Sequence, residues 1–258
     1  MGVEGVFLLT FNFQPSIYTL ALPYKENSDN KKKQVAQMFN NISARYDFLN
    51  HLLSMGIDKL WRKKAIRLLS NRPVKQLLDI ASGTGDFALA GLKLNPEKII
   101  GSDISQGMLN VGIEKIKKKE LQDIISFELG DAEDIKHEDG TFDAITVGFG
   151  VRNFENLEKG LSEMLRVLKP SGQVAILEFS KPKRFPIKQF YNFYFLNILP
   201  FIGKMISKDA SAYTYLPESV QEFPDGQDFL DIMQKVGYKN VKQYPVSFGI
   251  ASIYWGEK

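Results

Sequence analysis

Short apolar runs alternate with amphipathic stretches from residue 73 to the C-terminus. The apolar runs have the length and flanking turn residues of buried strands, and the intervals between them show helical periodicity. The predicted strands are 76–80, 98–102, 125–129, 142–147 and 173–179. The predicted helices lie near 86–94, 107–119 and 157–168. This alternation predicts an α/β domain with a doubly wound parallel sheet, covered on both faces by helices.

Both ends of the chain show other patterns. Apolar residues recur at helical spacing over 31–72, which should form a helical cover over a pocket. Residues 237–258 contain two strand-like runs with no helix between them, which predicts an antiparallel hairpin at the sheet edge. Residues 1–30 are apolar but broken by polar residues, so we expect an extension outside the domain 31–258 rather than a signal peptide.

The composition excludes several kinds of site. The chain of 258 residues carries 33 basic and 30 acidic side chains, a balance that leaves no nucleic-acid-binding footprint. It contains no cysteine and two histidines, so we expect no disulfide and no metal site. The absence of cysteine is compatible with a cytoplasmic location. The lysines of residues 31–33 are expected to lie on a solvated helix face.

A glycine-rich turn follows the first predicted strand, in LLDIASGTGDFALA. Gly83, Thr84 and Gly85 form this turn, and glycines let a backbone approach a ligand closely. The turn lies at the carboxyl end of a strand, where open α/β sheets bind ligands. The spacing from Gly83 through Ala88 also fits the dinucleotide-binding fingerprint. A purely structural turn is the third interpretation.

Two acidic residues follow the next strands. Asp103 comes about 20 residues after Gly83, where an acid can accept hydrogen bonds from ribose hydroxyls; alternatively, it caps the helix that follows. Asp131 and Ala132 come directly after the third strand. There an acid can accept a hydrogen bond from an adenine amino group while Ala132 backs the ring. A plain turn role for Asp131 stays open.

Together these three stretches resemble the class I S-adenosylmethionine-dependent methyltransferases. The resemblance implies a mostly parallel seven-stranded sheet with a C-terminal antiparallel hairpin, and S-adenosylmethionine as cofactor. By this resemblance, the glycine turn faces the methionine part, the second-strand acid holds the ribose and the third-strand acid holds the adenine. The implied cofactor-binding residues are Asp79, Gly83, Thr84, Gly85, Asp103, Ile104, Asp131 and Ala132. An NAD-dependent oxidoreductase would not explain the third stretch or the hairpin.

From about residue 33 onward, the chain is similar to the ubiquinone/menaquinone biosynthesis C-methyltransferases. The similarity rests on MFNNISARYDFLNHLLSMGIDKLWRK, FGVRNF, MLRVLKPSGQVAILEFSKP and YTYLPESVQEFPDGQDFLDIMQKVGY. Two positions depart from the family pattern: Ser82, where many members carry glycine, and Gly148, where some present a serine to the cofactor. The resemblance implies C-methylation of a polyprenylated quinol, and we favour demethylmenaquinol. A ubiquinone precursor, another apolar small molecule and a non-catalytic cofactor-binding subunit remain alternatives.

Methyl transfer to a quinol carbon requires alignment of donor and acceptor, and stabilisation of the oxyanion formed when a hydroxyl is deprotonated. Arg152 and Asn153 follow the fourth strand at the ligand-binding edge. We expect Arg152 to stabilise the oxyanion and Asn153 to orient the ring. A structural ion pair of Arg152 near a helix end is an equal alternative. Further candidates from the helical cover are Tyr46, Asp47, Asn50 and His51, the last more simply a packing residue.

An aromatic segment, residues 185–206, interrupts the domain between the fifth strand and the hairpin. Its uncharged run is shorter than the ~20 residues that span a bilayer. We expect residues 183–222 to form a lid for the prenyl tail that touches the inner membrane surface, although a plain helical core is the alternative. Polar replacements of Phe193 and Phe195 should then weaken long-tailed substrates most. The expected partners are the quinol, the membrane surface and a second copy of the chain, without nucleic acid.

Overall fold

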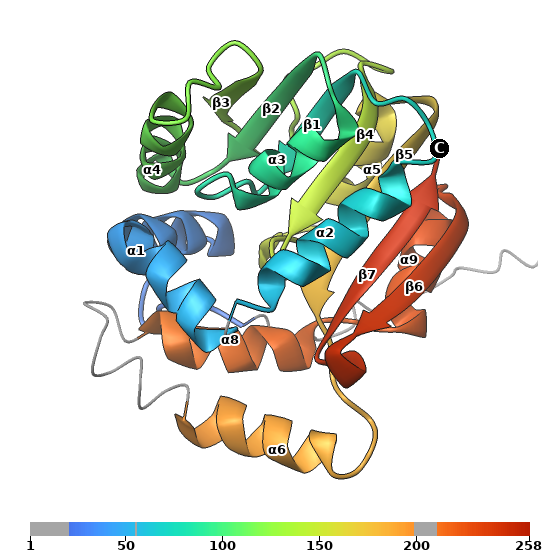
Figure 1. Cartoon of the computed structure of the whole chain (residues 1–258). Helices are drawn as coiled ribbons and strands as arrows, with labels where there is room; N and C mark the ends of the chain where they lie inside the picture. The colour runs from blue at the N-terminus through green and yellow to red at the C-terminus, as the bar shows by residue number, and fades with distance from the viewer. Residues whose placement is uncertain (1–20, 55, 199–210) are drawn as a thin grey trace, which may run out of the picture.

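The computed structural model describes residues 21–54, 56–198 and 211–258, which form one seven-stranded sheet (Figure 1) in the order β3-β2-β1-β4-β5-β7-β6. Its strands are β1 (Gln76–Ile80), β2 (Lys98–Asp103), β3 (Ile125–Leu129), β4 (Phe142–Gly148), β5 (Leu168–Phe179), β6 (Lys239–Val246) and β7 (Ala251–Glu257). The first five strands are parallel to one another, whereas β7 is antiparallel to both β5 and β6. The predicted fold class and terminal hairpin are therefore confirmed.

The helices connect and cover these strands. They are α1 (Lys31–Leu53), α2 (Asp58–Leu69), α3 (Asp86–Gly91), α4 (Gln106–Lys117), α5 (Leu157–Val167), α6 (Ile187–Phe193), α8 (Ser211–Glu222) and α9 (Gln227–Val236). A π-helical turn (η3, Tyr194–Ile198) continues α6. The strand that departs most from its prediction is β5, which begins at Leu168 because this residue already pairs with Phe142.

Alternate strand residues pack on opposite faces of the sheet. Leu77 joins a core cluster with Trp61 of α2, while its neighbour Leu78 joins another with Phe229 of α9. Burial of apolar area on both faces is what holds such a three-layer domain together. Figure 1 shows α2 and α3 in front of the sheet and α5 and α9 behind it. Both α1 and α2 were predicted to cover the pocket. The structure instead packs α2 against one face of the sheet, and only α1 lies over the strand ends.

The segment just before α1 packs against the domain, which differs from the extension predicted for residues 1–30. Ala21 is buried, and its backbone N–H donates to Glu222 of α8. The buried Gln34 side chain donates to the carbonyls of Asn27 and Asp29 and fixes the turn there. These contacts join distant parts of the chain, so no local pattern reveals them. The first 20 residues lie outside the described part of the chain.

Candidate active site

A pocket lies at the carboxyl ends of β1 to β4, beneath α1. This is the edge of the sheet at which the three sequence stretches were expected to meet. Among the predicted cofactor residues, those that line the pocket are Gly83, Asp103, Ile104, Asp131 and Ala132.

The two glycines of the first turn have different surroundings. Gly83 has a φ of 57° and faces the pocket, where a Cβ would stand 3.2 Å from the Met108 methyl. Gly85 has a φ of 82°, and a Cβ there would come within 2.5 Å of the Phe127 ring. Both positions therefore require glycine. Gly83 opens the pocket wall, whereas Gly85 lets the turn pack on β3.

Asp103 faces the pocket from the end of β2 and is 8% exposed. One carboxylate oxygen accepts the Gly83 N–H at 2.7 Å, and the other accepts the Ser105 N–H at 2.8 Å. Desolvation raises the pKa of Asp103 to about 6, against the lowering effect of these bonds. Each oxygen keeps a lone pair for a hydroxyl donor. The alternative role for Asp103 was to cap the next helix. In the structure the N-cap of α4 is Ser105, whose hydroxyl accepts the Met108 N–H.

Asp131 and Ala132 line the pocket from the loop after β3. One oxygen of Asp131 accepts the Glu133 N–H, so Asp131 also stabilises the turn, as the alternative interpretation expected. The other oxygen is 2.6 Å from Lys32 Nζ of α1, which also lies 3.3 Å from Glu133. Lys32 is thus part of the pocket, although the sequence suggested a solvated lysine run. Lys31 differs too: it is buried, and desolvation lowers its pKa to about 8.

Two predicted cofactor residues support the turn without lining the pocket. The fully buried Asp79 accepts from the Ser82 hydroxyl at 2.6 Å, the Thr146 hydroxyl at 2.7 Å and the Ala88 N–H at 3.1 Å. Desolvation raises its pKa to about 6. Thr84 turns its hydroxyl toward α1, where it donates to Asp47. Asp79 thus fixes the turn to β1 and the start of α3, and Thr84 joins the turn to α1.

Arg152 is held in a buried ion pair behind the pocket. Its Nη1 donates to Glu178 Oε1 at 2.7 Å and to the Phe149 carbonyl at 2.6 Å. The guanidinium also lies over the Phe179 ring, 5.7 Å from its centroid. Its Nε is buried and has no hydrogen-bond partner among the described residues. The ion-pair alternative is therefore present, with β5 supplying the carboxylate, and Arg152 itself does not line the pocket.

Asn153 lines the pocket beside Arg152. Its side-chain oxygen accepts a hydrogen bond from the Tyr215 hydroxyl of α8 at 3.0 Å. Tyr215 and Tyr191 belong to an apolar cluster that includes Val35 of α1. Asn153 therefore lies where the pocket meets this cluster, which we call the aromatic cluster.

Two strained residues border the pocket where β1 and β4 end. Ala81 and Phe149 have φ values of 51° and 58°, in the left-handed region that side chains rarely adopt. The two loops touch closely: a Cβ on Gly150 would stand 2.4 Å from that of Ala81. Such strain concentrates at functional sites. At Gly148, a Cβ would meet the ring of the core residue Phe87 at 2.9 Å, so a serine here would require that ring to shift.

The cover contributes two of its four candidates to this region. Tyr46 lines the pocket, and Asp47 contacts the first turn. The side chains of Asn50 and His51 lie outside the described residues. Sequence reasoning missed Lys32, Glu178 and the strained Ala81, because nothing in their local sequence marks them.

Curated proteins similar to this chain share most of its length. A demethylmenaquinone methyltransferase from Bacteroides fragilis is 50% identical over 92% of this chain and 96% of its own. The Porphyromonas gingivalis enzyme of the same name is 42% identical over 88% and 94%. A ubiquinone/menaquinone biosynthesis C-methyltransferase from Geobacter sulfurreducens is 44% identical over 88% and 90%.

Solved structures match at the level of the fold. A methyltransferase from Thermotoga maritima aligns with a TM-score of 0.61 at 17% identity, over 86% of this chain and 99% of its own. One from Methanococcus maripaludis gives a TM-score of 0.56 at 21% identity, over 91% and 97%. The model of the ubiE/COQ5 methyltransferase family matches residues 26–258. The predicted methyltransferase class and its cofactor S-adenosylmethionine are thus confirmed, and the chain belongs to the ubiE/COQ5 methyltransferase family.

Proposed function

We propose that this protein methylates a ring carbon of demethylmenaquinol, with S-adenosylmethionine as the methyl donor. The observation that carries the chemistry is the convergence of Gly83, Asp103 and Asp131 on one pocket that also contains Asn153. The choice of quinol is supported by relatives named demethylmenaquinone methyltransferase, one of them 50% identical. A ubiquinone precursor is the second candidate, favoured by the double name of the Geobacter sulfurreducens relative.

The residues of the pocket fit the cofactor. The Asp103 carboxylate would accept the ribose hydroxyls, and Asp131 would accept the adenine amino group with Ala132 against the ring. The small wall at Gly83 would admit the methionine part. When bound, S-adenosylmethionine supplies a methyl group on a sulfonium sulfur, which leaves as a neutral thioether when the quinol carbon attacks.

Arg152 and Asn153 are the residues we expect to act on the quinol. The guanidinium of Arg152, whose buried Nε has no partner among the described residues, would stabilise the oxygen on which negative charge develops, directly or through a water. Glu178 and the Phe149 carbonyl hold the guanidinium by Nη1, so its orientation is fixed before the substrate arrives. Asn153, held by Tyr215, can orient the ring through its amide group.

The apolar tail would lie in the aromatic cluster between α1, α8 and α6. Val35, Met38, Tyr191 and Tyr215 are buried there, next to Asn153. A site of this composition excludes water and favours a prenyl chain over a polar substituent. No described helix is long and apolar enough to span a membrane. We propose that the lipid-soluble tail enters from the membrane surface.

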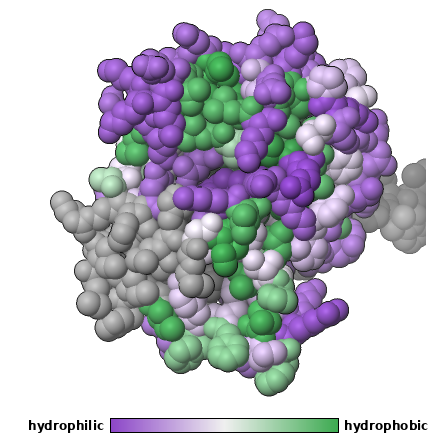
Figure 2. All heavy atoms as spheres, in the orientation of Figure 1, coloured by the Kyte–Doolittle hydropathy of each residue, from purple (hydrophilic) through white to green (hydrophobic). Residues whose placement is uncertain are grey.

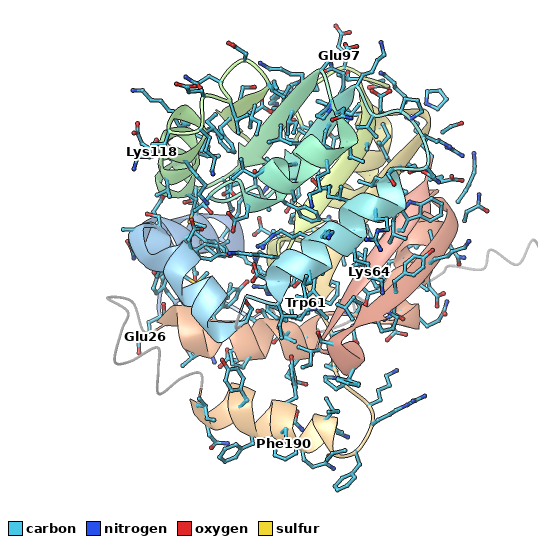
Figure 3. The ribbon with its side chains drawn as sticks, in the orientation of Figure 1. Glu26, Trp61, Lys64, Glu97, Lys118 and Phe190 are labelled. Carbon is cyan, nitrogen blue, oxygen red and sulfur yellow. The ribbon has the colours of Figure 1, made fainter. Side chains whose placement is uncertain are left out.

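The helix α6 is the element we propose for contact with the inner face of the membrane. It is the outermost element at this end of the molecule (Figure 1), and Phe190, labelled in Figure 3, projects from it. Phe185, Phe190 and Phe193 are 81%, 69% and 59% exposed. Figure 2 shows pale and green surface over α6 with hydrophilic purple at its edge. A homodimer remains a further proposal.

The test is a comparison of two quinols as methyl acceptors. The purified protein is incubated with S-adenosylmethionine and either demethylmenaquinol or a polyprenylated benzoquinol, and the products are separated by mass. We expect demethylmenaquinol to gain one methyl group at a higher kcat/KM. A higher kcat/KM for the benzoquinol would transfer the proposal to ubiquinone synthesis, and no methylated product from either quinol would contradict it.

A further inference from the structure

Three polar side chains of α1 each contact a different loop of the cofactor pocket. They are Lys32, Asn40 and Asp47, spaced by about two helical turns along one side of the helix. Lys32 Nζ contacts Asp131 in the loop after β3 at 2.6 Å. The Asn40 side-chain oxygen accepts from the Ser105 hydroxyl and the Gly107 N–H after β2, both at 2.8 Å.

Asp47 contacts the remaining loop, the glycine turn after β1. One of its oxygens accepts the Thr84 hydroxyl, and the other lies 2.7 Å from Lys115 Nζ of α4. Lys115 in turn reaches Asp86, at the start of α3, at 2.8 Å. The C-terminal half of α1 is therefore fastened to the glycine turn through a network that also includes α3 and α4.

The same helix also lines the pocket and packs against the aromatic cluster. Phe39 and Tyr46 line the pocket and pack at the edge of the cluster, and Met38 and Ile42 are buried within it. One helix is thus a shared wall of the cofactor site and of the proposed quinol site. Any shift of α1 that opens the first site also disturbs the second.

We propose that α1 closes over the bound cofactor, that Lys32, Asn40 and Asp47 are the positioning residues that hold it shut, and that this closure completes the quinol site. The cofactor therefore binds before the quinol, and the quinol delays its release. This order of binding rests on the proposed function, whereas the closure itself requires only a bound cofactor.

Matched pairs of variants on α1 test the closure. Asn40→Ala and Lys32→Met each remove the contacts of one side chain with one loop of the pocket. Their controls are Asn41→Ala, whose amide contacts Tyr24, and Lys33→Met, which is exposed. Stopped-flow measurement of S-adenosylhomocysteine release should give rates about three- to tenfold faster in each test variant than in its control, because each loses a net hydrogen bond. Equal rates within each pair would overturn the proposal.

Hydrogen–deuterium exchange gives a readout that is independent of activity. Saturating S-adenosylhomocysteine should slow amide exchange along α1 in the wild-type protein and less so in Asp47→Asn. Quinol affinity should rise in the presence of S-adenosylhomocysteine, by the same factor by which quinol raises affinity for that ligand. Unchanged exchange in α1 despite bound ligand would contradict closure, whereas failure of S-adenosylhomocysteine to bind at all would contradict the proposed function.

Discussion

Two buried carboxylates with similar environments have distinct tasks at the first two strand ends. Asp79 accepts three hydrogen bonds from the chain and supports the turn from below, whereas Asp103 accepts two and presents its remaining lone pairs to the pocket. Burial raises the pKa of each to about 6. The two carboxylates differ in exposure to the pocket, which Asp103 lines and Asp79 does not.

Asp103→Asn tests the ribose-binding role directly. The amide keeps one acceptor oxygen but turns an NH₂ group toward a backbone N–H, and it loses an acceptor for the ribose. We expect S-adenosylhomocysteine to bind more weakly by about 1–3 kcal/mol in calorimetric titration. Asp123→Asn, at an exposed position before β3, is the control. Equal affinity in both variants would remove Asp103 from the cofactor site.

The raised pKa of Asp103 also predicts a pH dependence of cofactor binding. In the proposed cofactor site, the carboxylate form of Asp103 would accept the ribose hydroxyls, and protonation would remove acceptor capacity. Affinity for S-adenosylhomocysteine should therefore be constant above about pH 7 and fall as the pH decreases through about 6. The same titration of Asp103→Asn should lose this inflection. Its persistence there would assign the titration to another group, with Asp79 the first candidate.

Local motifs explain which residues the sequence could predict. Gly83, Asp103 and Asp131 each follow an apolar strand at a fixed position, so the fold class alone brings them to one edge of the sheet. Lys32 and Glu178 reach the site through contacts distant in sequence, and the run containing Lys32 looks like an ordinary solvated helix face. Such residues become visible only in the folded chain.

At the scale of elements, α6 differs from the other helices in what it exposes. The stretch from 180 to 198 contains no acidic residue, and the cations Lys183, Arg184 and Lys188 accompany its exposed phenylalanines. Aromatic side chains insert at the bilayer interface, and cations are attracted to anionic headgroups. The predicted lid therefore coincides in part with a surface suited to the membrane. The side chain of Phe195 lies outside the described residues.

Vesicle binding tests this property of α6. The triple variant Phe185→Ser, Phe190→Ser, Phe193→Ser should bind vesicles of mixed neutral and anionic phospholipid at least tenfold more weakly in co-sedimentation, because about 1.5–3 kcal/mol is gained per inserted aromatic side chain. Leu60→Ser, on α2 and 64% exposed in the wild type, is the control. Equal loss in both proteins would mean that α6 has no special role, as would unchanged binding of the triple variant.

At the scale of the whole molecule, the buried pair of Arg152 and Glu178 joins the loop after β4 to β5. Both side chains are almost fully buried, and their charged atoms lie 2.7 Å apart. Breaking such a pair leaves one buried charge unpaired. The pair therefore contributes to the stability of the domain as well as to the proposed orientation of Arg152.

Urea unfolding separates these two roles. Arg152→Met should lower the free energy of unfolding by about 3–5 kcal/mol, since it leaves Glu178 unpaired. The double variant Arg152→Met, Glu178→Leu should regain most of that loss without regaining methyl transfer. Recovery of activity together with stability would show that Arg152 is purely structural.

The architecture was the part most open to prediction from sequence. Strand positions follow from apolar runs that bury alternate residues on both faces, and the antiparallel hairpin follows from two runs without a helix between them. The packing of residues 21–30 and the role of α2 as a layer of the sandwich were not predictable, because both depend on which surface remains uncovered after the sheet forms.

The central claim is methylation at carbon, and the position of the transferred methyl group tests it most directly. Demethylmenaquinol is incubated with the protein and S-adenosylmethionine labelled with ¹³C in its methyl group, and the product is examined by NMR. We expect a label at the chemical shift of an aromatic C-methyl, and no such label when the protein is omitted. A label at the shift of an O-methyl ether, or none in the quinol, would contradict it.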